Sequence, residues 1–234
     1  MEQKQPGGGY ESDPSRRHGL NSLAATSIQF AKIHRVPLYA ADYAENDLEH
    51  SAMLGLVAPE LAATLYPDLD EGLIRAYSLV HDLVELETGD EPSLKLTARQ
   101  RAIKKERERV AVFELAARLP RLRCQRLLEY ESQDSKEARF VCAVDKLLPV
   151  TTDLEMAIDG RGDIVRDRME ECFNIKTFGE LKKTNKTYLK YYEKKFGDEF
   201  PELAKMFRDQ MYEFLDGIKP AYDRQITLYD LGLE

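Results

Sequence analysis

Cysteine is scarce in this chain, and the few cysteines present are not paired. The 234 residues include only Cys124, Cys142 and Cys172, an odd number of widely spaced thiols. Such spacing indicates free thiols in a reducing compartment, and we expect a cytoplasmic protein. It also differs from the cysteine-rich, closed ligand set of a structural zinc site.

Long hydrophobic runs and excess positive charge are absent as well. No stretch approaches the ~18 consecutive apolar residues of a transmembrane helix, so we expect no membrane partner. Residues Met1 to Pro14 are polar and glycine-rich, without the hydrophobic segment of a signal peptide. With a net charge of -8, no broad surface for nucleic acid is expected, so a nucleic acid polymer is not a predicted partner.

What is present is a large share of apolar residues at helical spacing. The hydrophobic content of 43% is sufficient for a sizeable core. No strand-like alternation stands out, so we predict an all-α fold. A first helix is predicted over Leu20–Ile33 and should end before Pro37, because proline disfavours a helical residue in front of it. A second should begin near Asn46, and a third should run from Glu71 to about Leu86.

A long, highly charged helix is predicted next, over Thr97–Leu119. Its charges indicate a solvated outer face, with Ile103, Val110 and Phe113 turned inward. The remaining predicted helices run through 124–130, from a cap at Asp134 or Ser135 to just before Gly160, over 181–196 after a capping box at Thr177–Glu180, and from Pro201 to Gly217 and Pro220.

Two histidines and two aspartates on three of these helical segments can serve as ligands of one metal ion. They are His50, the adjacent His81 and Asp82, and Asp145. Imidazole and carboxylate together suit several divalent ions and select none sharply. An open site of this kind can activate water and polarise a phosphoryl group, so a metal-dependent phosphohydrolase is the leading interpretation. The alternatives are a core histidine at position 50 and a surface ion pair between Asp145 and Lys146.

An ordered set of motifs surrounds these residues. The motifs are Arg35-Val36-Pro37, Glu49-His50-Ser51, His81-Asp82-Leu83-Val84-Glu85, Thr88-Gly89-Asp90-Glu91-Pro92, Glu129-Tyr130-Glu131, and Glu137–Val141 leading to Asp145-Lys146. Because these motifs occur in this order, the chain resembles the HD-domain phosphohydrolases, and among them the branch that contains the 5'-deoxynucleotidases. The resemblance covers about Leu20 to Ala157.

The resemblance implies a role for each matching residue. His50, His81, Asp82 and Asp145 fall on the family's metal ligands, and Glu85 matches an acidic residue implicated in catalysis. No histidine follows the His-Asp pair, so the extra ligands of two-metal members are missing. We therefore expect one divalent ion, either Mn, Co, Mg, Zn, Ni or Fe. The residues that the resemblance places at the substrate are Arg35, Val36, Asp82, Asp90, Glu91, Pro92, Ser93 and Asp145.

One position departs from the family pattern. Members that read deoxyribose have an aromatic residue after the arginine, whereas this chain has Val36. A smaller side chain should reject a 2'-hydroxyl less strongly.

Together these features predict an HD-domain helical bundle with a C-terminal helical extension. The predicted parts are a disordered tail (1–17), the HD domain (18–173) and the extension (174–234), which should cover the site, build the interface of a homodimer, or both. The predicted substrate is a nucleotide, first a nucleoside 5'-monophosphate. A deoxynucleoside triphosphate hydrolase and a catalytically inactive metal-binding regulatory module are the alternatives.

Overall fold

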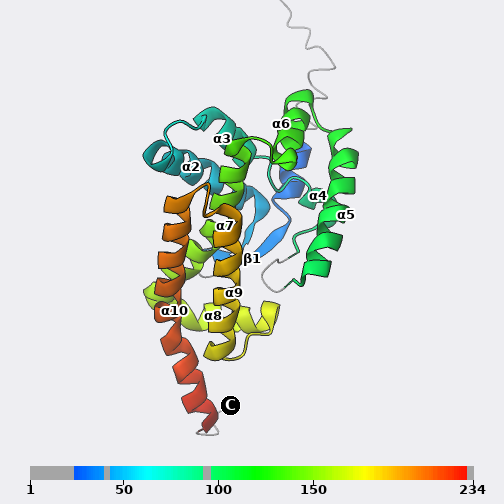
Figure 1. Cartoon of the computed structure of the whole chain (residues 1–234). Helices are drawn as coiled ribbons and strands as arrows, with labels where there is room; N and C mark the ends of the chain where they lie inside the picture. Colours follow the sequence, from blue (N-terminus) through cyan, green and yellow to red (C-terminus); the bar gives the residue numbers. More distant parts are fainter. Residues whose placement is uncertain (1–23, 40–42, 92–95, 231–234) are drawn as a thin grey trace, which may run out of the picture.

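The computed structural model describes residues 24–39, 43–91 and 96–230 of the chain, and it is all-α apart from one hairpin (Figure 1). Residues 24–30 are helical. The hairpin consists of β1 (His34–Tyr39) and β2 (Tyr43–Asn46). The helices are α2 (Asp47–Leu65), α3 (Glu71–Ser78), α4 (Glu85–Thr88), α5 (Ala98–Ala116), α6 (Arg121–Ser132), α7 (Lys136–Met156), α8 (Gly162–Phe173), α9 (Phe178–Phe196) and α10 (Pro201–Asp230), with a π-helical turn, η1 (Ala157–Arg161), between α7 and α8.

Helix α7 is the central element of the bundle. It packs against α2 and α3 on one side and against α9 and α10 on the other (Figure 1). Its buried Phe140, Val141 and Val144 belong to one apolar cluster with residues of α2, α9 and α10. Tyr192 of α9 donates its hydroxyl to the Ala143 carbonyl at 3.0 Å. A polar side chain on α7, such as Asp145, is thereby held in a tightly packed frame.

The predicted starts of several helices are confirmed by their caps. Asn46 accepts a hydrogen bond from the Glu49 amide, and the Glu49 carboxylate accepts one from the Asn46 amide. Thr177 and Glu180 form the same reciprocal pair at α9. Ser135 caps α7. Each cap satisfies amides that the first helical turn leaves without partners.

The hairpin was not predicted, and it shortens the first helix. The helix ends at residue 30 rather than at Ile33, and its predicted start at Leu20 lies outside the described residues. Strands of six and four residues are too short to show a clear alternation, and their pairing is irregular between His34 and Leu38. Pro37 lies in this irregular part, where it has no N–H to donate. The hairpin delivers Arg35 to the interior.

The predicted helix over Glu71 to Leu86 is interrupted. α3 ends at Ser78, and α4 begins only at Glu85. Between them the amides bond three residues back, as from Val80 to the Tyr77 carbonyl and from Leu83 to the Val80 carbonyl. These tight turns replace the regular helical ladder where the His-Asp pair lies.

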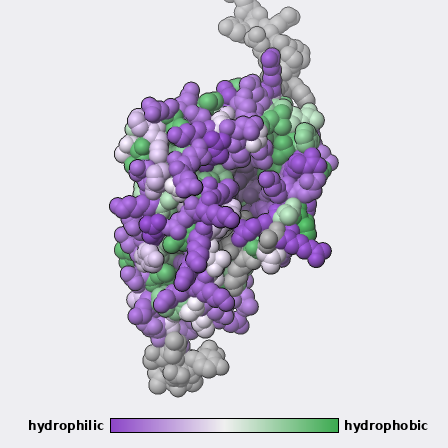
Figure 2. All heavy atoms as spheres, viewed as in Figure 1, coloured by the Kyte–Doolittle hydropathy of each residue, from purple (hydrophilic) through white to green (hydrophobic). Residues whose placement is uncertain are grey.

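Helix α5 faces the opposite way from the prediction. Ile103, Val110 and Phe113 are exposed, Phe113 by 61%, whereas Ala111, Val112 and Leu115 are buried. The helix packs mainly on the short α4 and α6, so only a narrow stripe is covered. Hydrophobic side chains consequently gather on the surface over α5 and α6, on an otherwise hydrophilic face (Figure 2).

Helix α10 does not end at Gly217 and Pro220 but continues to Asp230. Gly217 lies against Ala157, where an added Cβ would be in van der Waals contact. Ile218, Ala221 and Tyr222 are buried in a second apolar cluster shared with α8. This packing supports the helix beyond its proline. Within the described residues, every helix is either too short or too polar to cross a lipid bilayer.

Candidate metal centre

Because of the tight turns after α3, the side chains of His81 and Asp82 both point toward Asp145. The His81 Nδ1 lies 2.9 Å from the Ser78 carbonyl oxygen, which can only accept, so Nδ1 donates and Nε2 is directed toward the carboxylates. The His81 Nε2 is 2.9 Å from Asp82 Oδ2 and 3.6 Å from Asp145 Oδ1. Adjacent residues of a regular helix would instead project about 100° apart.

His50 reaches the same place from the first turn of α2. Its Nε2 lies 2.9 Å from Asp145 Oδ1, and its Nδ1 lies 3.2 Å from Glu45 Oε1. Glu45 is buried at the end of β2 and orients the imidazole through the nitrogen that does not face the cluster. Carboxylate–histidine pairs of this kind are the usual support of a metal-binding imidazole.

The four side chains form a site that fits one divalent cation. His50, His81, Asp82 and Asp145 each offer a ligand atom within 4.8 Å of all the others. The buried His81 Nε2 has no hydrogen-bond partner of acceptable geometry, which leaves a donor atom available for a metal. Burial lowers the pKa of His81, but Asp82 and Asp145 outweigh it and raise the pKa to about 10. The carboxylates of Asp82 and Asp145 therefore stabilise a positive charge that lies between them.

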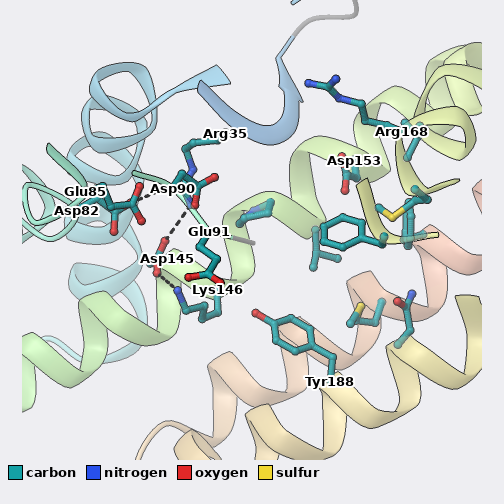
Figure 3. A pocket seen from close by; sticks show the side chains of 18 of the residues that line it. Arg35, Asp82, Glu85, Asp90, Glu91, Asp145, Lys146, Asp153, Arg168 and Tyr188 are labelled. Carbon is teal, nitrogen blue, oxygen red and sulfur yellow. Dashed lines mark hydrogen bonds and ion pairs between the residues drawn. The ribbon is translucent and has the colours of Figure 1, made fainter. Parts of the chain in front are cut away.

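Arg35 supplies part of that positive charge. Its guanidinium donates to Asp82 and lies 3.6 Å from Asp47 Oδ1 and 3.9 Å from Asp145 Oδ1. The residue predicted to hold phosphate therefore borders the metal ligands (Figure 3). Its planar fork suits phosphate oxygens as well as carboxylates.

Glu85 and Asp47 extend the acidic cluster. Together with Asp82 they form a second group of close carboxylates, and neither Asp47 oxygen has a hydrogen-bond partner. Burial, then Asp82 and Asp90, raises the pKa of Glu85 to about 10, so its carboxyl holds a proton at neutral pH while no cation is bound. Asp47 was missed in the sequence because an acid in the first turn of a helix usually serves the helix dipole.

A cavity of about 1060 Å³, counting solvent at its mouth, opens beside these ligands. Asp82, Glu85, Asp90 and Asp145 line one end with Arg35 (Figure 3). Glu91 also lines it, whereas Pro92 and Ser93 lie outside the described residues, as does the Val36 side chain. Further lining residues come from α5 and from α7 to α10.

Two lysines lie in the wall of the cavity. Lys146 Nζ lies 2.5 Å from Asp145 Oδ2, and Lys104 Nζ donates to the Glu91 carbonyl at 2.6 Å. Lys146 was noted in the sequence only beside Asp145, and Lys104 was not noted, because exposed lysines are common. Arg35 and Lys146 thus contact the ligands Asp82 and Asp145, and Lys104 adds a third cation to the cavity wall.

Comparison with known proteins agrees with this geometry. A sequence model of the HD domain family matches residues 32–188, more than half of the chain. The chain belongs to the HD domain family. This HD domain is similar to the crystal structure of a protein described as a predicted metal-dependent phosphohydrolase from Magnetospirillum magnetotacticum MS-1, with 23% identity and a TM-score of 0.62 over 87% of this chain and 97% of the other. No curated protein matches it.

The support of His50 by Glu45 leads to a testable expectation. Glu45→Gln should weaken metal affinity by about 10- to 100-fold, the usual effect of removing a carboxylate behind a metal-binding histidine. Isothermal titration of the metal-free protein with Mn²⁺ measures this, and Glu49→Gln, which affects only the helix cap, is the control. Equal affinities of Glu45→Gln and wild type would show that Glu45 does not support the ligand.

Proposed function

We propose that this HD domain is a metal-dependent phosphohydrolase that removes the phosphate from nucleoside 5'-monophosphates. The observation that carries the proposal is the convergence of His50, His81, Asp82 and Asp145 at one end of a cavity, with Arg35 beside them. Membership of the HD domain family and the likeness to a predicted metal-dependent phosphohydrolase support the general activity. The nucleotide substrate rests on the resemblance to the 5'-deoxynucleotidases.

Each residue has a role that its position supports. His50, His81, Asp82 and Asp145 would hold the cation, which when bound supplies Lewis acidity toward the phosphoryl group and activates water. Arg35 would bind phosphate oxygens, exchanging part of its present contact with Asp82. Glu85 lines the cavity with one buried, unpartnered oxygen, and it would exchange a proton with water there. Asp90 and Glu91 border the space for the nucleoside.

A screen of nucleotides tests this function. The metal-free protein is loaded in turn with each candidate divalent ion and offered nucleoside mono-, di- and triphosphates. Release of orthophosphate from monophosphates is the expected result. Release of triphosphate would assign a deoxynucleoside triphosphate hydrolase instead. Absence of every product with each metal would favour a regulatory metal-binding module.

We expect the enzyme to discriminate only weakly between ribose and deoxyribose. Val36 follows Arg35 on β1 and lacks the bulk that would exclude a 2'-hydroxyl. An apolar pocket alone discriminates an added hydroxyl by only about 10²-fold. We therefore expect kcat/KM for AMP to lie within that factor of kcat/KM for dAMP, and Val36→Trp to favour dAMP further. A strong deoxy preference in the wild type, unchanged by the substitution, would place sugar recognition elsewhere.

We also propose a homodimer that uses the exposed apolar face of α5. Val110 and Phe113 of α5 and Leu122 of α6 are exposed there. Light scattering after size exclusion should show twice the chain mass for the wild type and the chain mass for Phe113→Glu. Tyr212→Glu is the matched control, because Tyr212 is an equally exposed aromatic residue on α10. A monomeric wild type, or dissociation only in Tyr212→Glu, would contradict this interface.

A further inference from the structure

The cavity continues well beyond the metal ligands. Lys146, Val150 and Asp153 follow at i, i+4 and i+7 on α7, so one face of this helix forms a continuous wall. From Lys146 to Asp153 that wall rises by roughly 10 Å at 1.5 Å per residue. Figure 3 accordingly shows Asp153 and Arg168 at the opposite end from Asp82 and Glu85. We call this opposite end the distal end.

The lining of the distal end is mainly apolar. Apolar side chains from three different helices contribute to it, among them Val150, Val165, Met169, Phe173 and Phe214. An apolar cavity of this kind, with few polar groups, is the usual form of a small-molecule site. It favours a flat, weakly polar group over a second phosphate.

Two polar side chains in this lining have no polar partner within the described part of the chain. Asn185 of α9 is only 5% exposed, and its buried Nδ2 donates no hydrogen bond. Asp153 lines the same cavity, and burial followed by the charge of Glu45 raises the pKa of its carboxyl to about 7. The nearby Arg168 does not pair with it: one end of the guanidinium lies 3.6 Å from Glu171, and its buried Nε has no hydrogen-bond partner. A buried amide donor and a partly buried carboxyl without partners are costly unless a ligand supplies those partners.

We propose that the distal end binds the nucleobase of the substrate, with Asp153 accepting a hydrogen bond from an N–H of the base and Asn185 donating one to a ring nitrogen or carbonyl. A base combines a flat apolar face with such an edge, which matches this lining. A phosphate held beside Arg35 would leave the nucleoside pointing along the α7 wall toward Asp153. The inference rests on the proposed nucleotide substrate and adds the residues that recognise the base.

The first test compares substrates with and without a base. Nucleoside 5'-monophosphates and ribose 5-phosphate share the sugar and the phosphate. We expect the ratio of their kcat/KM values to fall about tenfold in Asp153→Leu and in Asn185→Leu, as loss of one hydrogen bond of about 1.4 kcal/mol implies. Asp159→Leu, which replaces an exposed carboxylate that pairs with Arg161, is the matched control and should keep the wild-type ratio.

The second test needs no catalysis. Calorimetric titration of the metal-loaded protein with nucleosides that lack phosphate should detect binding that weakens about tenfold in Asp153→Leu. Nucleoside binding without any phosphate release would leave the base site standing while the proposed activity failed. Phosphate release with an unchanged substrate ratio, and unchanged nucleoside binding in a folded Asp153→Leu, would overturn the base site alone.

Discussion

Asp82→Ala should remove nearly all phosphohydrolase activity, and the loss should coincide with loss of the metal. Asp82 lies between His81 and Arg35 and is the most accessible of the four ligands to the cavity. Removing it deletes a charged oxygen ligand and leaves Arg35 without its nearest carboxylate. Because loss of a residue behind a ligand already costs about 10- to 100-fold in affinity or activity, loss of the ligand itself should exceed about 100-fold.

Metal content and turnover must be measured on the same preparation. Inductively coupled plasma analysis should show substoichiometric metal in Asp82→Ala, and chelation of the wild type should produce the same inactive state, reversed by Mn²⁺ or Co²⁺. Asp68→Ala, an exposed aspartate before α3, is the control for a general effect of charge. Full metal occupancy in Asp82→Ala, or an active chelated wild type, would refute the ligand assignment.

Glu85→Gln should keep the fold and the metal but reduce kcat by about 10²- to 10⁴-fold, the usual contribution of a positioned acid or base. Burial and the surrounding carboxylates already bias Glu85 toward its protonated form, and the amide retains the volume without an exchangeable acidic proton. The effect should appear in kcat with saturating substrate, whereas KM should change little.

The neighbouring Glu87 provides the matched control for this experiment. It lies on the same short helix, but it faces outward and pairs with Arg118. Glu87→Gln should therefore retain wild-type kcat. Should Glu85→Gln turn over substrate at the wild-type rate with full metal occupancy, Glu85 would have no part in the proton transfer.

Local features of the fold were predictable because their causes lie within a few residues. The capping boxes at Asn46 and Thr177 depend on a side chain and an amide three positions apart. The breaks that the sequence prediction misplaced depend on distant packing instead. Pro220 is accommodated because Ile218 and Tyr222 are buried against α8, and Phe113 is exposed because too little of the structure covers α5.

The candidate site likewise has features that could be predicted from the sequence and features that depend on tertiary packing. The ligand chemistry could be predicted from the residue types alone, since two imidazoles and two carboxylates suit a divalent ion wherever they come together. Their meeting was decided by the tertiary structure. His50 and Asp145 touch across 95 positions, and Arg35 and Asp82 touch across 47. Such contacts depend on how α2, α3 and β1 pack around α7.

Asp47, Lys146 and the distal pair Asp153 and Asn185 illustrate what only the packing could reveal. Each resembles an ordinary surface residue in the sequence, because charged and amide side chains are usually solvated. Folding brings Asp47 close to Arg35 and places Lys146, Asp153 and Asn185 in the cavity. The loss of water there makes an unpaired group such as the Asn185 amide costly and so selects a complementary ligand. The type of chemistry follows from the sequence, and the shape and polarity of the substrate space follow from the helices that enclose it.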